Sequence, residues 1–282
     1  MISHTFQASR RLCAALLLAL PLVWMAPAHA ATAESDAEAW VARIKSGGLL
    51  SLSDEALIAA FSQLHPQAIP AYLQLGVQPF NEYEMWMRRE ERLADGWTRK
   101  PFLNHIKYRH QPRQIYVKWL KDSPKAGQEI IYDETRRKDA MLGHAGGLFN
   151  ITSVWTALDG ALARGNSNHS IRDLGVQFIV DTIVRENSQR AAAGLPTAPA
   201  RIEVANFQGE RCVALTWMAA PGLGKGYAHR VKVLVDLRQP LVRQIEAWDA
   251  AGEMLERIAL ERIVPARFDE DTFNPKNPAY DF

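Results

Sequence analysis

Apolar residues in the first third of the chain recur every three or four positions, which predicts short helices. The first set, before Gly47-Gly48, consists of Ala37, Trp40, Val41 and Ile44. The second set follows Ser53, the expected N-cap, and consists of Leu57, Ile58, Phe61 and Leu64. We therefore expect helices within residues 31–80.

From Asn81 onward the hydrophobic period shortens to two residues, which predicts strands. In the clearest strand Ile115, Val117 and Trp119 alternate with Tyr116 and Lys118. The first three should share the covered face of a sheet, and the other two should lie on the opposite, solvated face. The same reasoning predicts strands over residues 82–93, 97–109, 113–120, 128–134, 139–144, 201–207, 211–218, 227–237, 242–249 and 253–264.

One amphipathic helix is predicted to interrupt the strands, over residues 170–190. Its apolar stripe comprises Ile171, Leu174, Phe178, Ile179, Thr182 and Ile183, and the polar residues expected to face water are Asp173, Gln177 and Asp181. Strands on either side of such a helix indicate an α+β fold, in which helices cover one face of a curved antiparallel sheet.

The N-terminal thirty residues have the pattern of a secretory signal peptide. Arg10 and Arg11 precede an apolar run over residues 12–25, and Ala28-His29-Ala30 supplies small residues at the −1 and −3 positions. We expect cleavage after Ala30 and a periplasmic mature protein that is not an integral membrane protein. Residues 31–80 would then pack on the sheet of residues 81–282, whose lid helix lies near 170–190, and form one globular domain with it.

The charge balance excludes some partners. The chain has 33 basic and 31 acidic residues, and removal of residues 1–30 leaves the two numbers equal. This balance argues against nucleic acid or an anionic membrane surface as the main partner. Cleavage leaves Cys212 as the one cysteine, so no intramolecular disulfide forms, and we expect an inert buried thiol.

The sequence contains none of the motifs of the usual exported hydrolases, neither Gly-x-Ser-x-Gly nor His-Glu-x-x-His. The glycine-rich segment 222–226 lacks the Ser or Thr that follows the lysine of a phosphate-binding loop. His169 and Asp173, four residues apart, are either a base and its orienting acid or, more simply, part of a helix start where His169 and Ser170 satisfy free N–H groups. We expect no catalytic residue, no metal ligand and no cofactor.

Several segments together resemble a known family. They are residues 112–120, 127–132 and 168–175, Leu255-Glu256-Arg257 and residues 277–280. The chain resembles, over about residues 80–282, an uncharacterised family of secreted bacterial domains similar to the lipoprotein-carrier (LolA-like) fold. Ser170 departs from the pattern, where a proline is expected between His169 and Ile171.

The resemblance implies an open half-barrel whose concave face is covered by helices, and a cavity for acyl chains. The residues expected to line that cavity are Ile115, Val117, Trp119, Tyr132, Leu174, Phe178, Ile179 and Trp217. The favoured function is a non-enzymatic periplasmic carrier or binder of a lipid or acyl-chain ligand, or of an acylated protein. The alternatives are an envelope protein-binding module or chaperone without a small ligand, and a hydrolase with an unrecognised site.

Overall fold

The structure is a computed structural model that describes residues 28–146, 152–165, 167–220 and 228–282. Most of the expected signal peptide and the glycine-rich segment 222–226 lie outside these residues. Across the described ranges, no helix combines the length and the apolar character needed to span a membrane.

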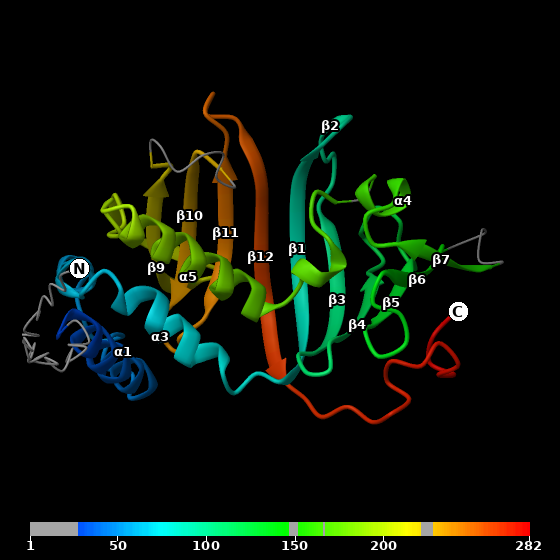
Figure 1. The fold of residues 1–282 in the computed structure, drawn as a ribbon, viewed down its shortest axis with the longest axis horizontal. Helices are drawn as coiled ribbons and strands as arrows, with labels where there is room; N and C mark the ends of the chain where they lie inside the picture. The colour runs from blue at the N-terminus through cyan, green and yellow to red at the C-terminus, as the bar shows by residue number, and fades with distance from the viewer. Residues whose placement is uncertain (1–27, 147–151, 166, 221–227) are drawn as a thin grey trace, which may run out of the picture.

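A single antiparallel sheet forms the centre of the molecule (Figure 1). Its strands run in the order β7-β6-β5-β4-β3-β1-β12-β11-β10-β9-β8, and the short β2 pairs with β1. The strands are β1 (Glu82–Leu93), β2 (Gly96–Trp97), β3 (Phe102–Arg109), β4 (Gln114–Trp119), β5 (Glu129–Asp133), β6 (Ala140–His144), β7 (Ser153–Ala157), β8 (Arg201–Phe207), β9 (Glu210–Met218), β10 (Arg230–Asp236), β11 (Val242–Trp248) and β12 (Met254–Pro265). Within the described chain β7 and β8 do not pair with each other, so the curved sheet stays open. The predicted α+β half-barrel architecture is confirmed.

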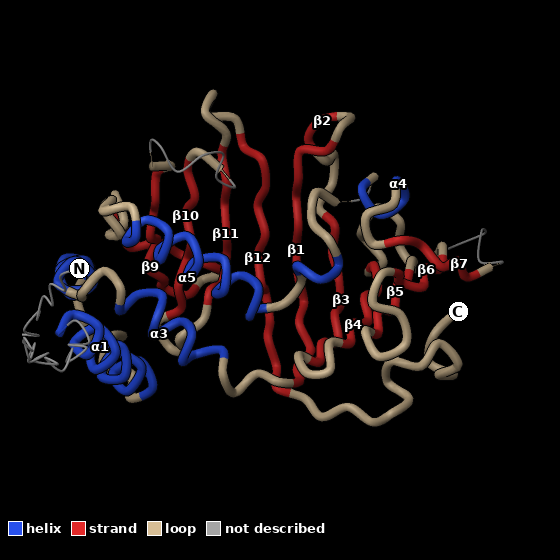
Figure 2. The backbone as a smooth tube through the Cα atoms, viewed as in Figure 1, coloured by secondary structure: helices blue, strands red, loops and turns tan. Residues whose placement is uncertain are grey.

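The longer helices lie on the side of the sheet that contains β8 to β12, whereas the short α4 (Ala161–Arg164) contacts β7 at the other side (Figure 1). The longer helices are α1 (Ala28–Lys45), α2 (Asp54–Gln63), α3 (Ala68–Val77) and α5 (Val176–Ala192). Figure 2 shows α3 and α5 crossing in front of β9 to β12. Ser53 caps α2 as predicted, because its hydroxyl accepts a hydrogen bond from the Ala56 N–H at 3.2 Å.

The helix predicted over residues 170–190 is broken near its start. Ser170 caps a 3₁₀ turn over Ile171–Asp173, and α5 begins only after Gly175, whose φ is 107°. A Cβ on Gly175 would lie 2.8 Å from the Tyr108 ring, so the chain approaches the sheet there more closely than any side chain permits. Periodicity alone gives no sign of this break.

Tyr116, on the second face of β4, is buried, which corrects one expectation, whereas Lys118 on the same face is partly exposed. Ile115, Val117 and Trp119 belong to the core that the sheet shares with the helices, as predicted. Tyr116 lies on the opposite face, but the C-terminal segment covers it there, and the rings of Tyr116 and Tyr280 stack 4.1 Å apart. The aromatic residues of the C-terminal segment therefore remove Tyr116 from solvent.

Candidate ligand-binding cavity

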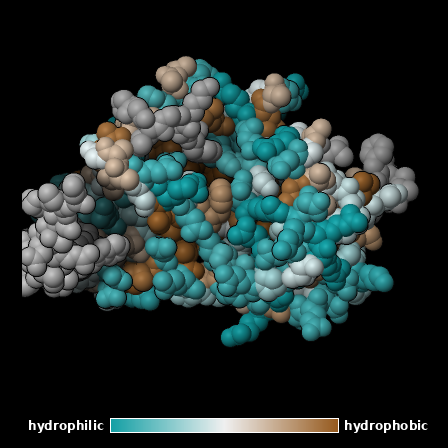
Figure 3. Space-filling view, in the orientation of Figure 1, coloured by the Kyte–Doolittle hydropathy of each residue, from teal (hydrophilic) through white to brown (hydrophobic). Residues whose placement is uncertain are grey.

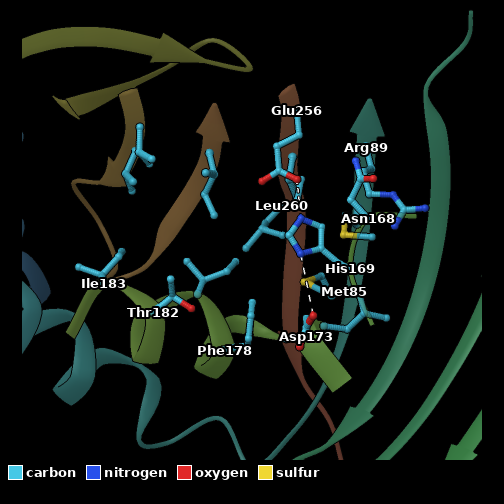
Figure 4. A pocket seen from close by; sticks show the side chains of 18 of the residues that line it. Met85, Arg89, Asn168, His169, Asp173, Phe178, Thr182, Ile183, Glu256 and Leu260 are labelled. Carbon is cyan, nitrogen blue, oxygen red and sulfur yellow. Dashed lines mark hydrogen bonds and ion pairs between the residues drawn. The ribbon is translucent and has the colours of Figure 1, made fainter. Parts of the chain in front are cut away.

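A cavity of about 340 Å³ lies between α5 and the sheet (Figure 4). Its floor is apolar and consists of Met85, Met87, Val231, Val233, Ile245, Ile258 and Leu260. Its roof consists of Leu174, Phe178, Ile179, Thr182 and Ile183. In the space-filling view, apolar side chains show in a hollow alongside α5 (Figure 3). The volume falls within the range of about 300–1,000 Å³ that is typical of small-molecule sites.

The predicted cavity residues divide into two groups. Leu174, Phe178 and Ile179 line the cavity, and Trp217 lines a smaller adjoining space of about 40 Å³ that shares Ile183, Val231 and Val233 with it. The others are buried in the core outside the cavity: Ile115, Val117, Trp119 and Tyr132. They lie on β4 and β5, whereas α5 crosses β9 to β12 (Figure 1).

Helix α5 has a second covered face, which corrects the expectation that Gln177 faces water. The Gln177 side chain is buried, accepts a hydrogen bond from the Tyr83 hydroxyl at 3.0 Å and donates one to the Phe80 carbonyl. The Val176 N–H also donates to the Tyr83 hydroxyl, at 2.9 Å. Asp181 is exposed, as expected. Gln177 thus joins α5 to β1 and to the loop before it.

One end of the cavity is charged. Arg89 and Glu91 on β1 are both buried, and the Arg89 Nε lies 2.8 Å from a Glu91 carboxylate oxygen. Arg89 also donates to the Ser167 hydroxyl at 2.7 Å, and the Asn168 N–H donates to Glu91 at 2.8 Å. These contacts fix the chain before α5 against the sheet.

His169 extends this charged end toward β12. Its Nε2 lies 2.6 Å from a carboxylate oxygen of Glu256, and its Nδ1 lies 4.0 Å from Asp173 (Figure 4). Burial acts to lower the pKa of His169, but the hydrogen bond and charge of Glu256, together with Glu91 and Asp173, outweigh it and raise the pKa above 6.5.

This pairing corrects the interpretation of His169 as part of a helix cap. Ser170 and Asp173 cap the turn by themselves: the Arg172 N–H donates to the Ser170 hydroxyl at 3.4 Å, and the Ser170 N–H donates to Asp173 at 2.9 Å. The His169 ring instead pairs with Glu256 on β12. Its partner Glu256 lies 87 residues further along the chain, and no local pattern connects the two.

The sequence contains a signal for the charged side chains at this end of the cavity. Arg89 and Glu91 have the same parity along β1 as the buried Tyr83, Met85 and Met87, so strict alternation places both charges on the covered face. Glu256 has the same relation to Ile258 on β12, where both residues line the cavity.

The site offers an apolar enclosure with charged side chains at its ends, which suits an amphiphilic ligand. The described residues include no group of three or more His, Cys, Asp or Glu side chains placed to hold a metal ion. Cys212 packs in a separate cluster with Phe207, Ala214 and Leu234, and burial raises the pKa of its thiol to about 11. The Ser167 hydroxyl donates to Glu91 at 3.1 Å.

Comparison with known proteins gives a family and several distant structures. Residues 80–282 match a family described as "Protein of unknown function (DUF1571)", and no functionally curated protein matches the sequence. An uncharacterised conserved protein from Thermus thermophilus is 10% identical, with 71% of this chain and 89% of that chain covered and a TM-score of 0.40. A LolA superfamily protein from Nitrosomonas europaea is 8% identical, with coverages of 74% and 97% and a TM-score of 0.29. The MucA/MucB complex of Pseudomonas aeruginosa gives 13% identity, coverages of 73% and 59%, and a TM-score of 0.40.

Proposed function

The chain belongs to the DUF1571 family of proteins of unknown function, and on that premise we propose that it is a non-enzymatic carrier or binder of a lipid-like ligand in the periplasm. The observation that carries the proposal is the apolar cavity between α5 and the sheet. The ligand is a lipid or an acyl chain, either free or attached to a protein.

The physical basis is the hydrophobic effect. Transfer of a methylene group from water into an apolar enclosure contributes about 0.8 kcal/mol. Phe178 and Ile179 on α5 face Met87 and Ile258 on the sheet across the cavity, so an alkyl chain there contacts carbon on both sides. Most residues of the cavity wall are apolar, so an alkyl chain can bury its apolar surface against them.

The proposal is tested by fluorescence titration with an alkyl probe that carries a neutral head group. We expect the wild-type protein to bind it and Phe178→Ala to change its dissociation constant, because Phe178 forms part of the cavity wall. Ile258→Trp fills the space and should weaken binding by about tenfold or more.

Phe61→Ala is the matched control for Phe178→Ala. Phe61 is buried against Trp40, away from the cavity, so its truncation lowers stability but leaves probe binding unchanged. A wild-type protein that binds no alkyl probe would refute the proposal. Native mass spectrometry of protein purified from its own envelope, with extraction of lipid, then identifies the ligand.

Protein binding is the second candidate function, and the edge strand β7 favours it. Val154 and Trp155 on this strand are 51% and 43% exposed, although most apolar residues of the sheet are buried. An edge strand with exposed apolar side chains can pair with a strand of another chain. Retention of a partner by the wild type but not by Trp155→Ala, in a protein that binds no alkyl probe, would favour this function instead.

A further inference from the structure

Polar groups line the two ends of the cavity, and its middle is apolar. His169, Asp173 and Glu256 lie at the end near the start of α5, and Arg185 and Glu186 lie at the other end. Glu186 is ten residues beyond Val176, about 15 Å along the helix. A single-chain amphiphile in this space places its hydrocarbon in the middle and its head group at one end.

The His169 end carries an excess of negative charge. Arg89 and His169 line this end together with the acids Asp173 and Glu256, and Glu91, buried behind the lining against Arg89, is a third acid. Even with His169 protonated, the sum is −1. At the other end Arg185 and Glu186 cancel each other. A charged head group is therefore drawn to the His169 end only if it is positive.

The acceptor that can meet such a head group is the second oxygen of Glu256. Glu256 is 3% exposed, and one of its carboxylate oxygens binds His169. Figure 4 shows the other oxygen on the side away from His169, toward β11 and β10, where the apolar floor begins. The pairing with His169 uses one oxygen, so the second oxygen can accept a further hydrogen bond at the cavity wall. A ligand that donates a hydrogen bond to this oxygen gains affinity.

Donors for an anionic head group are already engaged. Arg89 binds Glu91 and Ser167, and both ring nitrogens of His169 face carboxylates. A carboxylate or phosphate at this end would meet Glu256 and Asp173 as like charges, and like charges that approach closely repel strongly in a buried site.

Resting on the proposed function, we propose that the cavity selects amphiphiles with a primary ammonium head group, which donates an N–H to the second carboxylate oxygen of Glu256, over amphiphiles with a carboxylate head on the same chain. A neutral hydroxyl head, which donates without charge, ranks between them.

The test is a competition at pH 7, below the micelle concentration, in which dodecylamine, dodecanol and dodecanoic acid displace the neutral fluorescent probe from the full-length mature protein. We expect dodecylamine to displace the probe at a concentration about tenfold lower than dodecanoic acid. In Glu256→Gln, which keeps the shape of the side chain and removes the charge, the two concentrations should approach within about threefold.

Glu186→Gln is the matched control, because it removes the same charge at the other end of the cavity and should keep the preference. Asp173→Asn provides a second test at the His169 end if Glu256→Gln does not fold. Equal displacement by the amine and the acid, or loss of the preference in Glu186→Gln instead of Glu256→Gln, would overturn this inference and leave the carrier function standing. Failure of all three compounds to bind the wild type would instead reject the carrier function itself.

Discussion

At the residue scale, the charged side chains at the cavity end position the chain that leads into α5. A buried ion pair contributes little net stability, because desolvation offsets the attraction between its charges. The Arg89–Glu91 and His169–Glu256 pairs nevertheless join residues 167–169 to β1 and β12 by short contacts. Their main effect is to hold the residues that precede α5 in place against the sheet.

The raised pKa of His169 predicts a pH dependence of stability. A pKa that is higher in the folded than in the unfolded state adds stability that is fully present below 6.5 and is lost as the pH rises through the folded value. The free energy of unfolding of the wild type should therefore fall above pH 6.5, and His169→Gln should lack this component. Urea unfolding at pH 6, 7, 8 and 9 measures the difference, with His229→Gln, at an exposed histidine, as control. Parallel curves for wild type and His169→Gln would contradict it.

The burial of Val117 predicts a large effect of charge on β4. Val117→Asp places an unpaired carboxylate in the core and should lower the free energy of unfolding by about 3–5 kcal/mol. Val154→Asp makes the same change at an exposed position of β7 and should alter it by less than about 0.5 kcal/mol. Thermal unfolding compares the two, and an unchanged melting temperature in Val117→Asp would show that this face is not covered.

At the element scale, the sequence predicts most strands, but it does not predict where α5 begins. The sequence predicts β1 and β8 with the bounds they have. On β1 every second residue from Tyr83 to Glu91 is buried, and on β8 Ile202 and Val204 pack partly buried against the core. β7 was not predicted, because all its residues are at least partly exposed and no hydrophobic alternation marks it. The break at Gly175 depends on contact with Tyr108, which is 67 positions away in the sequence, so periodicity cannot reveal it.

The conformation of Gly175 predicts that α5 is sensitive to a single methyl group. Gly175→Ala meets the ring of Tyr108 and the hydroxyl of Tyr83, and it adopts a φ of 107°, so it should cost more than about 3 kcal/mol in combined strain and clash. Gly194→Ala, at the other end of α5, has a positive φ with open space around it and should cost about 1–2 kcal/mol. Chemical denaturation of both variants checks this, and equal losses would argue against the close approach.

At the scale of the whole molecule, the two halves of the sheet differ in how they are packed. The half from β1 through β12 to β10 lies under α5 and leaves a cavity, whereas β4 has helix-side core on one face and Tyr280 on the other. The sequence predicts that helices cover one face of the sheet, but it does not predict which strands border the cavity. The residues that face the helices on β4 are as apolar as those on β10. Half of the predicted cavity residues therefore lie in solid core.

The position of α1 gives a prediction about the mature protein. Among residues 32–45 of α1, whose side chains the structure describes, Ala33, Ala37, Trp40 and Ile44 are buried. Cleavage after Ala30 would leave these four residues in the chain. We predict that N-terminal sequencing of the exported protein begins at Ala31. Recovery of an intact Met1 terminus in the membrane fraction would contradict the proposed periplasmic location.

Helix α5 is attached to the sheet at both of its ends, and this has a consequence for the proposed carrier function. Tyr83 holds Val176 and Gln177 at one end, and at the other Arg190 donates to the Met218 carbonyl. If the protein carries a ligand as proposed, these two attachments favour entry and exit beside α5 rather than by rotation of the helix. Exchange would then follow the relative affinities of the ligand's donor and acceptor, without a conformational stroke of α5.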